Sequence, residues 1–238
     1  MNIISYNIHH GVGLDGKLSL KRIANLITES SGTIIGIQEV DKFYSDRSNF
    51  EDQAKELATL LNFHYCYEAN ISLEPTDGNT KDRQYGIAIL SKYPIIKSEH
   101  ILLSSYGKEQ RGVLSATIDI NGVYITVYNT HLGLDVPSRI TQVNELIDIT
   151  ARFQGPKVLL GDFNTEPGSE EIQLLLNNTD FVDSFKNIKN ANTFPSIDPN
   201  KRIDYIFTSA HIRNANQKVI HSSASDHLPI ITKLTITL

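Results

Sequence analysis

The apolar and polar positions of the chain alternate between a helical and a strand-like period. The helical period is clear from Leu20 to Ile27, where apolar residues recur three and four positions apart, and Ser19 is placed to cap that helix. Pro137-Ser138 marks the entrance of a later helix. Apart from the first helix, the pattern predicts helices around three apolar sets: Ala54, Leu57, Ala58 and Leu61; Ile140, Val143, Leu146, Ile147 and Ala151; Ile172, Leu175 and Leu176.

Short apolar runs bounded by turn residues predict strands. Asn121-Gly122 separates two of these runs, which is a strong signal for a β-hairpin. A hairpin within an alternation of helices and strands favours an α/β fold with two packed mixed sheets and helices outside them. Residues 65–82 form the longest region without clear periodicity. The predicted strands are residues 2–6, 33–37, 85–90, 113–120, 123–128, 158–160, 203–207 and 229–236.

Composition narrows the class of protein. Hydrophobic residues make up 40% of the 238 residues, which excludes general disorder. With 22 Lys+Arg against 27 Asp+Glu, the net charge is −5, which excludes a strongly basic coat for nucleic acid or membrane. Glycine and proline are dispersed without a linker, so we expect residues 1–238 to form a single domain.

The chain carries no sign of export or of membrane insertion. Cys66 is the only cysteine, so no intrachain disulfide can form, which fits either a reducing compartment or a fold that needs no disulfide. The first residues lack the basic and apolar regions of a signal peptide, and no apolar run is long enough to span a bilayer. We therefore expect a cytoplasmic location without integral membrane association.

Polar residues gather where the strand-like runs begin or end. We expect the runs that end in Gln38-Glu39 or Gly161-Asp162, among others, to bring their polar ends to one rim of the sheets. Taken singly, an Asp or Asn after a strand is usually a turn residue or a helix cap, and a single His is usually structural. The residues predicted to meet at this rim are Asn7, Glu39, His131, Asp162, Asn164, Asp204, Asp226 and His227.

This set of side chains indicates a particular chemistry. Carboxylate and amide oxygens suit Mg²⁺ or Mn²⁺, whereas the absence of thiolate pairs and of helical His spacing disfavours zinc. Histidine and asparagine donors beside a divalent ion suit a phosphate oxyanion, and a carboxylate can orient and deprotonate water. Asp204 lies in an apolar run, where an ionised carboxylate needs a partner. The rim therefore favours metal-assisted hydrolysis of a phosphoester.

These residues also carry a family resemblance. The motifs resemble those of the endonuclease/exonuclease/phosphatase superfamily, which is DNase I-like, and they follow its order over nearly the whole chain. The resemblance implies a four-layered α/β sandwich of two mixed sheets flanked by helices. The motifs are SYN (5–7), IQEV (37–40), YGIAILSK (85–92), NTHL (129–132), GDFN (161–164), RIDYIF (202–207) and SDHLP (225–229).

The resemblance implies a role for each rim residue. Glu39 would be the main Mg²⁺ ligand, assisted by Asn7 and with Asp226 nearby. Asp162, helped by Asn164, would orient or deprotonate the attacking water.

By the same resemblance, His227 would contact the scissile phosphate, oriented by Asp204, and His131 would donate to a phosphate oxygen. Asp162 and His227 share the role of general base in this prediction.

The chain departs from the family pattern beside the first asparagine. Some family nucleases have an acidic metal ligand two positions after it, where this chain has His9, so a second metal site of that kind is in doubt. His9 and His10 are candidates for substrate binding, with His10 as a plain loop residue as the alternative. Arg47 and Arg111 are candidates for binding phosphate, with solvated surface arginines as the alternative.

We therefore predict a soluble, Mg²⁺-dependent (or Mn²⁺-dependent) phosphoesterase that acts on a small-molecule or lipid-derived phosphodiester or phosphomonoester. A nuclease is the alternative, although the sequence has no Lys/Arg run and no Trp to favour nucleic acid. A catalytically silent binding module is disfavoured because the catalytic set is complete. The sequence leaves open the substrate, the number of metal ions and the oligomeric state.

Overall fold

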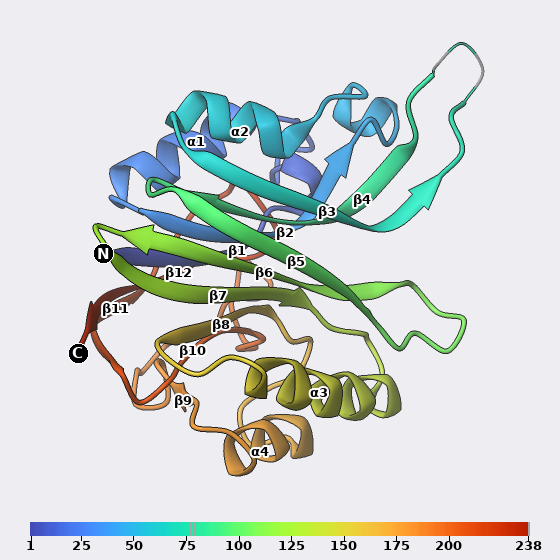
Figure 1. Ribbon diagram of the computed structural model, residues 1–238. Coiled ribbons are helices and arrows are strands. Elements are labelled where there is room, and N and C mark those ends of the chain that lie inside the picture. The colour runs from blue at the N-terminus through green and yellow to red at the C-terminus, as the bar shows by residue number, and fades with distance from the viewer. Residues whose placement is uncertain (77, 79, 238) are drawn as a thin grey trace.

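Two six-stranded mixed sheets pack face to face, and helices cover their outer faces (Figure 1). The computed structural model describes residues 1–76, 78 and 80–237. In Figure 1 both termini lie at one end of the molecule. This arrangement confirms the predicted α/β sandwich.

Each sheet contains one parallel pair of strands in its centre and antiparallel pairs elsewhere. The first sheet has the order β11 (Ile212–Val219), β12 (Ile230–Ile236), β1 (Asn2–Asn7), β2 (Ile34–Lys42), β4 (Arg83–Ser91) and β3 (His64–Leu73). The second has the order β5 (Ile95–Leu103), β6 (Arg111–Ile120), β7 (Val123–His131), β8 (Lys157–Asp162), β10 (Asp204–Thr208) and β9 (Val182–Asp183). The parallel pairs are β1 with β2 and β7 with β8. In each pair the carboxyl ends of the two strands therefore lie at the same edge of the sheet.

Amphipathic helices form the outer layers. The α-helices of the described chain are α1 (Leu20–Glu29), α2 (Gln53–Leu61), α3 (Val136–Ala151) and α4 (Glu170–Asn177), and two short 3₁₀ helices span His9–Gly11 and Asp46–Ser48. Apolar faces of α1 and α2 pack on the first sheet, and those of α3 and α4 pack on the second. Ser19 caps α1 as predicted, accepting from the amide of Arg22.

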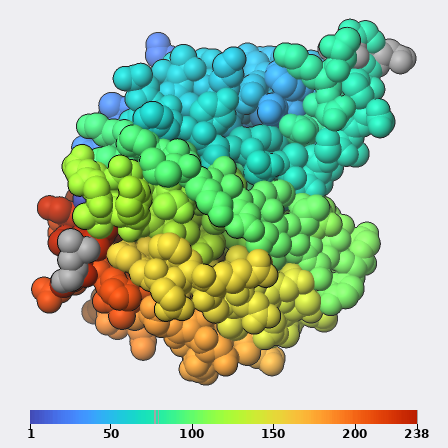
Figure 2. Space-filling model, in the orientation of Figure 1, coloured from blue at the N-terminus to red at the C-terminus, as the bar shows by residue number. Residues whose placement is uncertain are grey.

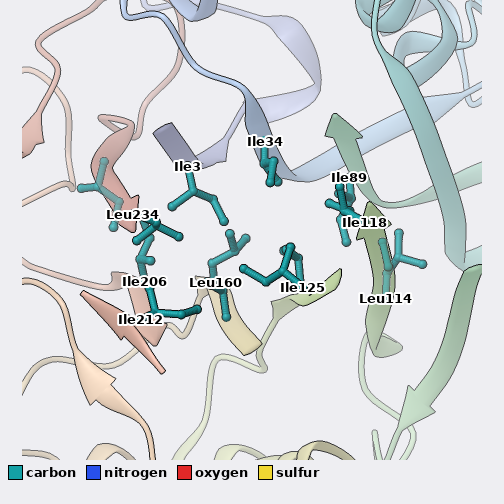
Figure 3. Close-up of a cluster of buried hydrophobic side chains, with 14 of the residues drawn as sticks. Ile3, Ile34, Ile89, Leu114, Ile118, Ile125, Leu160, Ile206, Ile212 and Leu234 are labelled. Carbon is teal, nitrogen blue, oxygen red and sulfur yellow. The ribbon is translucent and has the colours of Figure 1, made fainter. Parts of the chain in front are cut away.

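Branched aliphatic side chains fill the space between the sheets. Figure 3 shows Ile3 and Ile34 of the first sheet facing Leu160 and Ile125 of the second. All four are fully buried, as expected for positions on the inner faces of two packed sheets. In Figure 2 the green strands β5 to β7 separate the blue-to-cyan half of the molecule from the yellow-to-orange half.

Four strands are absent from the predicted set, and each lies at the edge of a sheet. Residues 65–82, the longest region without clear periodicity, contain most of β3, and residues 77 and 79 of that segment lie outside the described residues. The other three are β5, β9 and β11. Edge strands bury little of either face, so β3 and β5 lack the apolar alternation that marks a half-buried strand.

The prediction that Gln38-Glu39 ends the second strand is wrong. The strand β2 continues to Lys42, and its pairing with β4 shifts register between Ile37 and Val40. This irregularity is a β-bulge, which re-aims one side chain without ending the strand. Glu39 therefore lies within a strand and still projects to the rim of the sheets.

None of the helices in the described part of the chain combines the length and the apolar character that a membrane span needs.

Candidate active site

The register of three strands in the second sheet brings the central carboxylate and its neighbours together. Asp162 ends β8, and it pairs directly with His131 at the end of β7 and with Asp204 at the start of β10. Residues paired across neighbouring strands have their β-carbons about 5 Å apart. The three side chains therefore start from adjacent positions on one rim.

Gly161 allows the close approach of β8 to β7. It has a φ of +146°, and a β-carbon there would lie 1.9 Å from the carbonyl oxygen of Thr130. Only glycine fits a backbone contact of this kind. Gly161 thus fixes where Asp162 is presented.

Asn7 connects the two sheets across the rim. Its Nδ2 donates to Oε1 of Glu39 at 2.9 Å and to Oδ2 of Asp162 at 3.1 Å. Its Oδ1 accepts from the amide of His9 at 3.1 Å. One side chain at the end of β1 thereby links a carboxylate of each sheet.

Glu39 reaches this position because of the bulge in β2. Its φ is +58°, in the left-handed region that a residue with a side chain rarely adopts. Such a conformation costs roughly 1–3 kcal/mol and tends to persist at functional sites. The strained backbone turns the Glu39 carboxylate toward Asn7.

Asp204, His227 and Asp162 form a buried chain of charged groups. Nδ1 of His227 donates to Oδ2 of Asp204 at 3.0 Å, and its Nε2 lies 3.6 Å from Oδ2 of Asp162. Burial disfavours the imidazolium, but the carboxylates of Asp204 and Asp162 outweigh it and raise the pKa of His227 to about 10. Burial is the main cause that raises the pKa of Asp162 to about 7.

His131 is neutral, and its tautomer is fixed by an arginine. Nη1 of Arg111 donates to Nδ1 of His131 at 2.9 Å, so the ring hydrogen is on Nε2. That Nε2 lies 3.5 Å from Oδ2 of Asp162. Burial, followed by the charges of Arg111 and His227, lowers the pKa of His131 well below its usual value.

Asn164 and the segment before β12 complete the rim. The amide of Asn164 donates to Oδ1 of Asp162 at 2.9 Å, and its Nδ2 donates to the carbonyl of Leu132 at 3.0 Å. Ser225 Oγ donates to the Asn7 carbonyl at 2.8 Å and is 3.3 Å from Oδ1 of Asp226. These hydrogen bonds hold the loop of Asn164 at the end of β7 and the loop of Ser225 at the end of β1.

The remaining predicted residues occupy two different settings. Arg111 is buried, and besides His131 its Nη1 also contacts the Glu109 carboxylate at 2.9 Å. Arg47 makes two hydrogen bonds of 2.7 and 2.8 Å to the buried carboxylate of Asp41, and its guanidinium packs on the ring of Tyr44. Arg47 is therefore an exposed arginine whose guanidinium is held by Asp41, and no contact joins it to the central carboxylate among the described residues.

His9 and His10 form a tight turn beside Glu39. Both have positive φ, +45° and +41°, and their rings meet edge to face with centroids 4.4 Å apart. Burial, with the charge of Arg47 next, lowers the pKa of His10 to about 4. His10 is thus a neutral imidazole in the physiological range.

Some residues at the site were not predicted from the sequence. Nε2 of Gln38 donates to Oδ1 of Asn129 at 2.7 Å in the space between the sheets, so a fully buried amide pair lies behind the rim. Phe194 packs on the ring of His227 with centroids 4.8 Å apart. Polar residues inside apolar runs give a sequence signal for the amide pair, whereas Phe194 has none because it lies in a loop.

The donor set suits a hard divalent cation. The carboxylates of Glu39 and Asp162 both accept hydrogen bonds from the side-chain amide of Asn7. A divalent cation bound beside them would neutralise the negative charge of both carboxylates. Oδ1 of Asp204 is buried without a hydrogen-bond partner among the described residues, so the negative charge of the rim is not fully compensated. The carboxylates of Glu39 and Asp226 have oxygens of the kind that Mg²⁺ or Mn²⁺ takes, whereas Oδ1 of Asn7 accepts from the amide of His9.

Comparisons with known proteins agree with this geometry. The sequence model of the Endonuclease/Exonuclease/phosphatase family matches residues 4–227. Protein cwh43 of Schizosaccharomyces pombe is 30% identical over 186 residues, and the match covers 75% of this chain but only 18% of that much longer protein.

Two solved structures share the fold over the whole chain. An endonuclease/exonuclease/phosphatase from Beutenbergia cavernae is 23% identical with a TM-score of 0.85, and the match covers 100% of this chain and 72% of that one. The mannosyl-6-phosphatase Bt3783 of Bacteroides thetaiotaomicron is 20% identical with a TM-score of 0.77, and the match covers 99% and 100%.

Proposed function

The chain belongs to the Endonuclease/Exonuclease/phosphatase family, whose members are metal-dependent phosphoesterases. From this premise we propose that it hydrolyses a small-molecule or lipid-derived phosphodiester or phosphomonoester by attack of water. The observation that carries the proposal is the convergence of Glu39, Asp162 and His227 on one rim, tied together by Asn7 and Asp204.

In this proposal Asp162 receives the proton of the attacking water. Its pKa of about 7 matches a group that accepts a proton near neutral pH. The amide of Asn164 holds one oxygen of Asp162, which leaves the other facing His131 and His227. The water would therefore be oriented beside both histidines.

The two histidines stabilise the phosphate in different ways, because His227 is charged and His131 is neutral. His227, paired with Asp204, is a cation at neutral pH and complements the charge of the transition state. His131 offers a neutral Nε2–H group whose direction is set by Arg111. Both act as donors to phosphate oxygens, and His227 then protonates the leaving group.

Glu39 and Asn7, with Asp226 nearby, would hold a divalent cation that is Mg²⁺ or Mn²⁺. When bound, that cation supplies electrostatic stabilisation of the negative phosphate. The bulge in β2 positions the carboxylate of Glu39 for this cation, and the contact with Ser225 positions the carboxylate of Asp226.

The surroundings of the rim favour a compact substrate over nucleic acid. Three of the basic side chains near it are already paired: Arg47 with Asp41, Arg111 with Glu109, and Lys108 with Asp135. A polymer that tracks phosphates needs unpaired Lys and Arg along a groove.

A small cavity beside Arg111 offers room for the rest of a small substrate. It measures about 250 Å³ and is lined by the two loops that contain Ser105 and Leu134. Tyr106 is 68% exposed and Leu134 is 75% exposed on these loops. Exposed apolar side chains beside a mainly apolar cavity that Arg111 also lines suit a lipid-derived molecule with a phosphate head.

The proposal is tested with a substrate panel in Mg²⁺ or Mn²⁺. The panel contains p-nitrophenyl phosphate, bis(p-nitrophenyl) phosphate, inositol phosphates, sphingomyelin, RNA, plasmid DNA and abasic-site DNA. We expect hydrolysis of small or lipid phosphoesters, and losses of at least about 100-fold in Asp162→Asn and His227→Ala.

The matched control is His64→Ala, because His64 is an exposed histidine at the start of β3. It should keep wild-type turnover. Near wild-type turnover in His227→Ala would remove that residue from the mechanism, and cleavage of nucleic acid alone would favour the nuclease.

A further inference from the structure

Asn129 is a polar side chain at a position where the fold favours an apolar one. It lies in β7 between Leu114 of β6 and Leu160 of β8, and both leucines belong to the apolar core between the sheets (Figure 3). Paired residues of neighbouring strands project from the same face, so the Asn129 side chain also points toward the first sheet. It is fully buried, and an amide in such a place costs free energy unless it is hydrogen-bonded.

The side-chain amide of Asn129 bonds to the first sheet at the bulge that contains Glu39. Its Nδ2 donates to the carbonyls of Ile37 and Ala88, each at 2.9 Å. These two residues form the last pair of β2 and β4 before the register shift. Oδ1 of Asn129 accepts from Nε2 of Gln38 at 2.7 Å. Three hydrogen bonds therefore run from one residue of the second sheet to the two strands of the bulge.

Gly36 leaves the space that this amide occupies. A β-carbon at Gly36 would lie 3.1 Å from Cγ of Asn129, closer than an ordinary van der Waals contact, and would overlap a methyl group of Leu160. Because position 36 has no side chain, Asn129 reaches the backbone of β2 directly. The sequence of β2 thus accommodates the contact on its own side.

We propose that Asn129 is a positioning residue that holds the bulge of β2 and so fixes the Glu39 carboxylate relative to Asp162. The inference rests on the proposed function, in which Glu39 holds the cation. The left-handed conformation of Glu39, with a φ of +58°, costs free energy and persists only where the surroundings hold it. The hydrogen bond of Asn129 to the Ile37 carbonyl supplies such a hold two residues before Glu39.

Asn129 is joined to the other half of the site by its own strand. It lies two residues before His131, and β7 pairs in parallel register with β8, which ends at Asp162. Asn7 makes a separate link between the Glu39 and Asp162 carboxylates at the rim. One link at the rim and one behind it fix both the separation and the direction of the two carboxylates, whereas a single link leaves a pivot.

The test uses Asn129→Leu, which keeps the approximate size of the side chain and removes its three hydrogen bonds. The matched control is Asn70→Leu, because Asn70 is also buried and joins the sheets, with its Oδ1 3.1 Å from Nε2 of His100. Its hydrogen bond connects β3 to β5 and does not involve β2.

The first measurement is hydrogen exchange of the backbone amides in the full-length protein, which needs neither metal nor substrate. In Asn129→Leu, residues 36–41 and 86–90 should exchange at least about 10-fold faster relative to the rest of the two sheets. Asn70→Leu should leave that ratio unchanged. Asn129→Asp, which keeps the acceptor and removes the donors, should act in the same direction and replaces the leucine variant if urea unfolding shows that variant to be unfolded.

The second measurement is turnover as a function of Mg²⁺ on the substrate found with the panel. Asn129→Leu should lower kcat and raise the half-saturating Mg²⁺ concentration, each at least about 10-fold. Because Asn129 acts through Glu39, the double variant with Glu39→Ala should be little worse than Glu39→Ala alone.

Two results would overturn the proposal. One is exchange that stays unchanged, or that rises uniformly over both sheets, in the variants of Asn129, since a uniform rise means that the residue serves general stability alone. The other is a loss of turnover that multiplies with that of Glu39→Ala. If the wild type hydrolysed nothing in the panel, the proposed function would fail, and hydrogen exchange alone would still decide whether Asn129 holds the bulge.

Discussion

Asp162 is the residue on which the contacts of the rim converge. It accepts from Asn7 and from the amide of Asn164, and its Oδ2 lies 3.5 Å from His131 and 3.6 Å from His227. It is almost completely buried, so each of these contacts acts in a medium of low dielectric constant. Changes at any one of these residues should therefore affect the charge of the others.

The first prediction concerns the pair Asp204 and His227. If Asp204 acts by orienting His227 and stabilising its charge, its removal matters only while the imidazole is present. Asp204→Ala and His227→Ala should each reduce kcat/KM at least about 100-fold, and the double variant should be little worse than His227→Ala alone. Losses that multiply in the double variant would mean that the two residues act separately.

The second prediction concerns pH. The folded-state pKa of His227, about 10, is above its ordinary value of 6.5, so the folded protein binds a proton that the unfolded chain releases between those values. This contribution to the free energy of unfolding is complete below pH 6.5 and is lost as pH rises toward 10. Asp204→Asn removes one source of the shift, so its stability should fall less steeply across that range than wild type does.

The measurement is urea unfolding at a series of pH values in the presence of a chelator, together with NMR titration of the His227 ring. The ring pKa in Asp204→Asn should lie well below that of wild type. An unchanged ring pKa would show that Asp204 does not hold the charge of His227.

At the scale of secondary structure, predictability follows the position of a strand in its sheet. The eight predicted strands are the inner strands β1, β2, β4, β6, β7, β8, β10 and β12, whose apolar runs reflect burial by a second sheet or a helix. The strands that were missed are the edges, such as β3, which has polar or exposed residues on both faces. An edge strand forms because its backbone hydrogen-bonds to the neighbouring strand, and the pattern of apolar and polar side chains does not reveal that pairing.

The positions of several candidate site residues were predictable for a related reason. Asn7, His131 and Asp162 end inner strands, where a change from apolar to polar residues marks the rim. Glu39 was expected at a strand end and lies in a bulge, because register shifts depend on pairing with β4. The partners of Arg111 and Arg47 were not predictable, since both depend on contacts between segments distant in sequence.

The third prediction concerns the contact of β7 with β8. Gly161→Ala places a methyl group against the Thr130 carbonyl, so the strands must separate and the free energy of unfolding should fall by roughly 3 kcal/mol. Gly107→Ala is the control, because Gly107 also has a positive φ of +77° but has open space around it. Equal losses in the two variants, measured by urea unfolding, would attribute the effect to φ alone and not to the strand contact.

At the scale of the whole molecule, the site exists only where the two sheets meet. Glu39 and Asn7 come from the first sheet, and Asp162 and His131 come from the second. The apolar core between the sheets holds these groups within hydrogen-bond distance. We therefore propose that residues 1–238 act as one domain, in which neither sheet has a complete site alone.

The most informative single measurement is the dependence of phosphoester hydrolysis on Mg²⁺ in wild type, Glu39→Ala and the control Glu56→Ala. Glu56 is an exposed carboxylate on α2, so its removal tests for a general effect of charge. We predict saturable activation of wild type and Glu56→Ala by Mg²⁺. For Glu39→Ala we predict turnover at least about 100-fold lower, with saturation moved to higher Mg²⁺. Unchanged Mg²⁺ activation and turnover in Glu39→Ala would contradict a metal-dependent site on this rim.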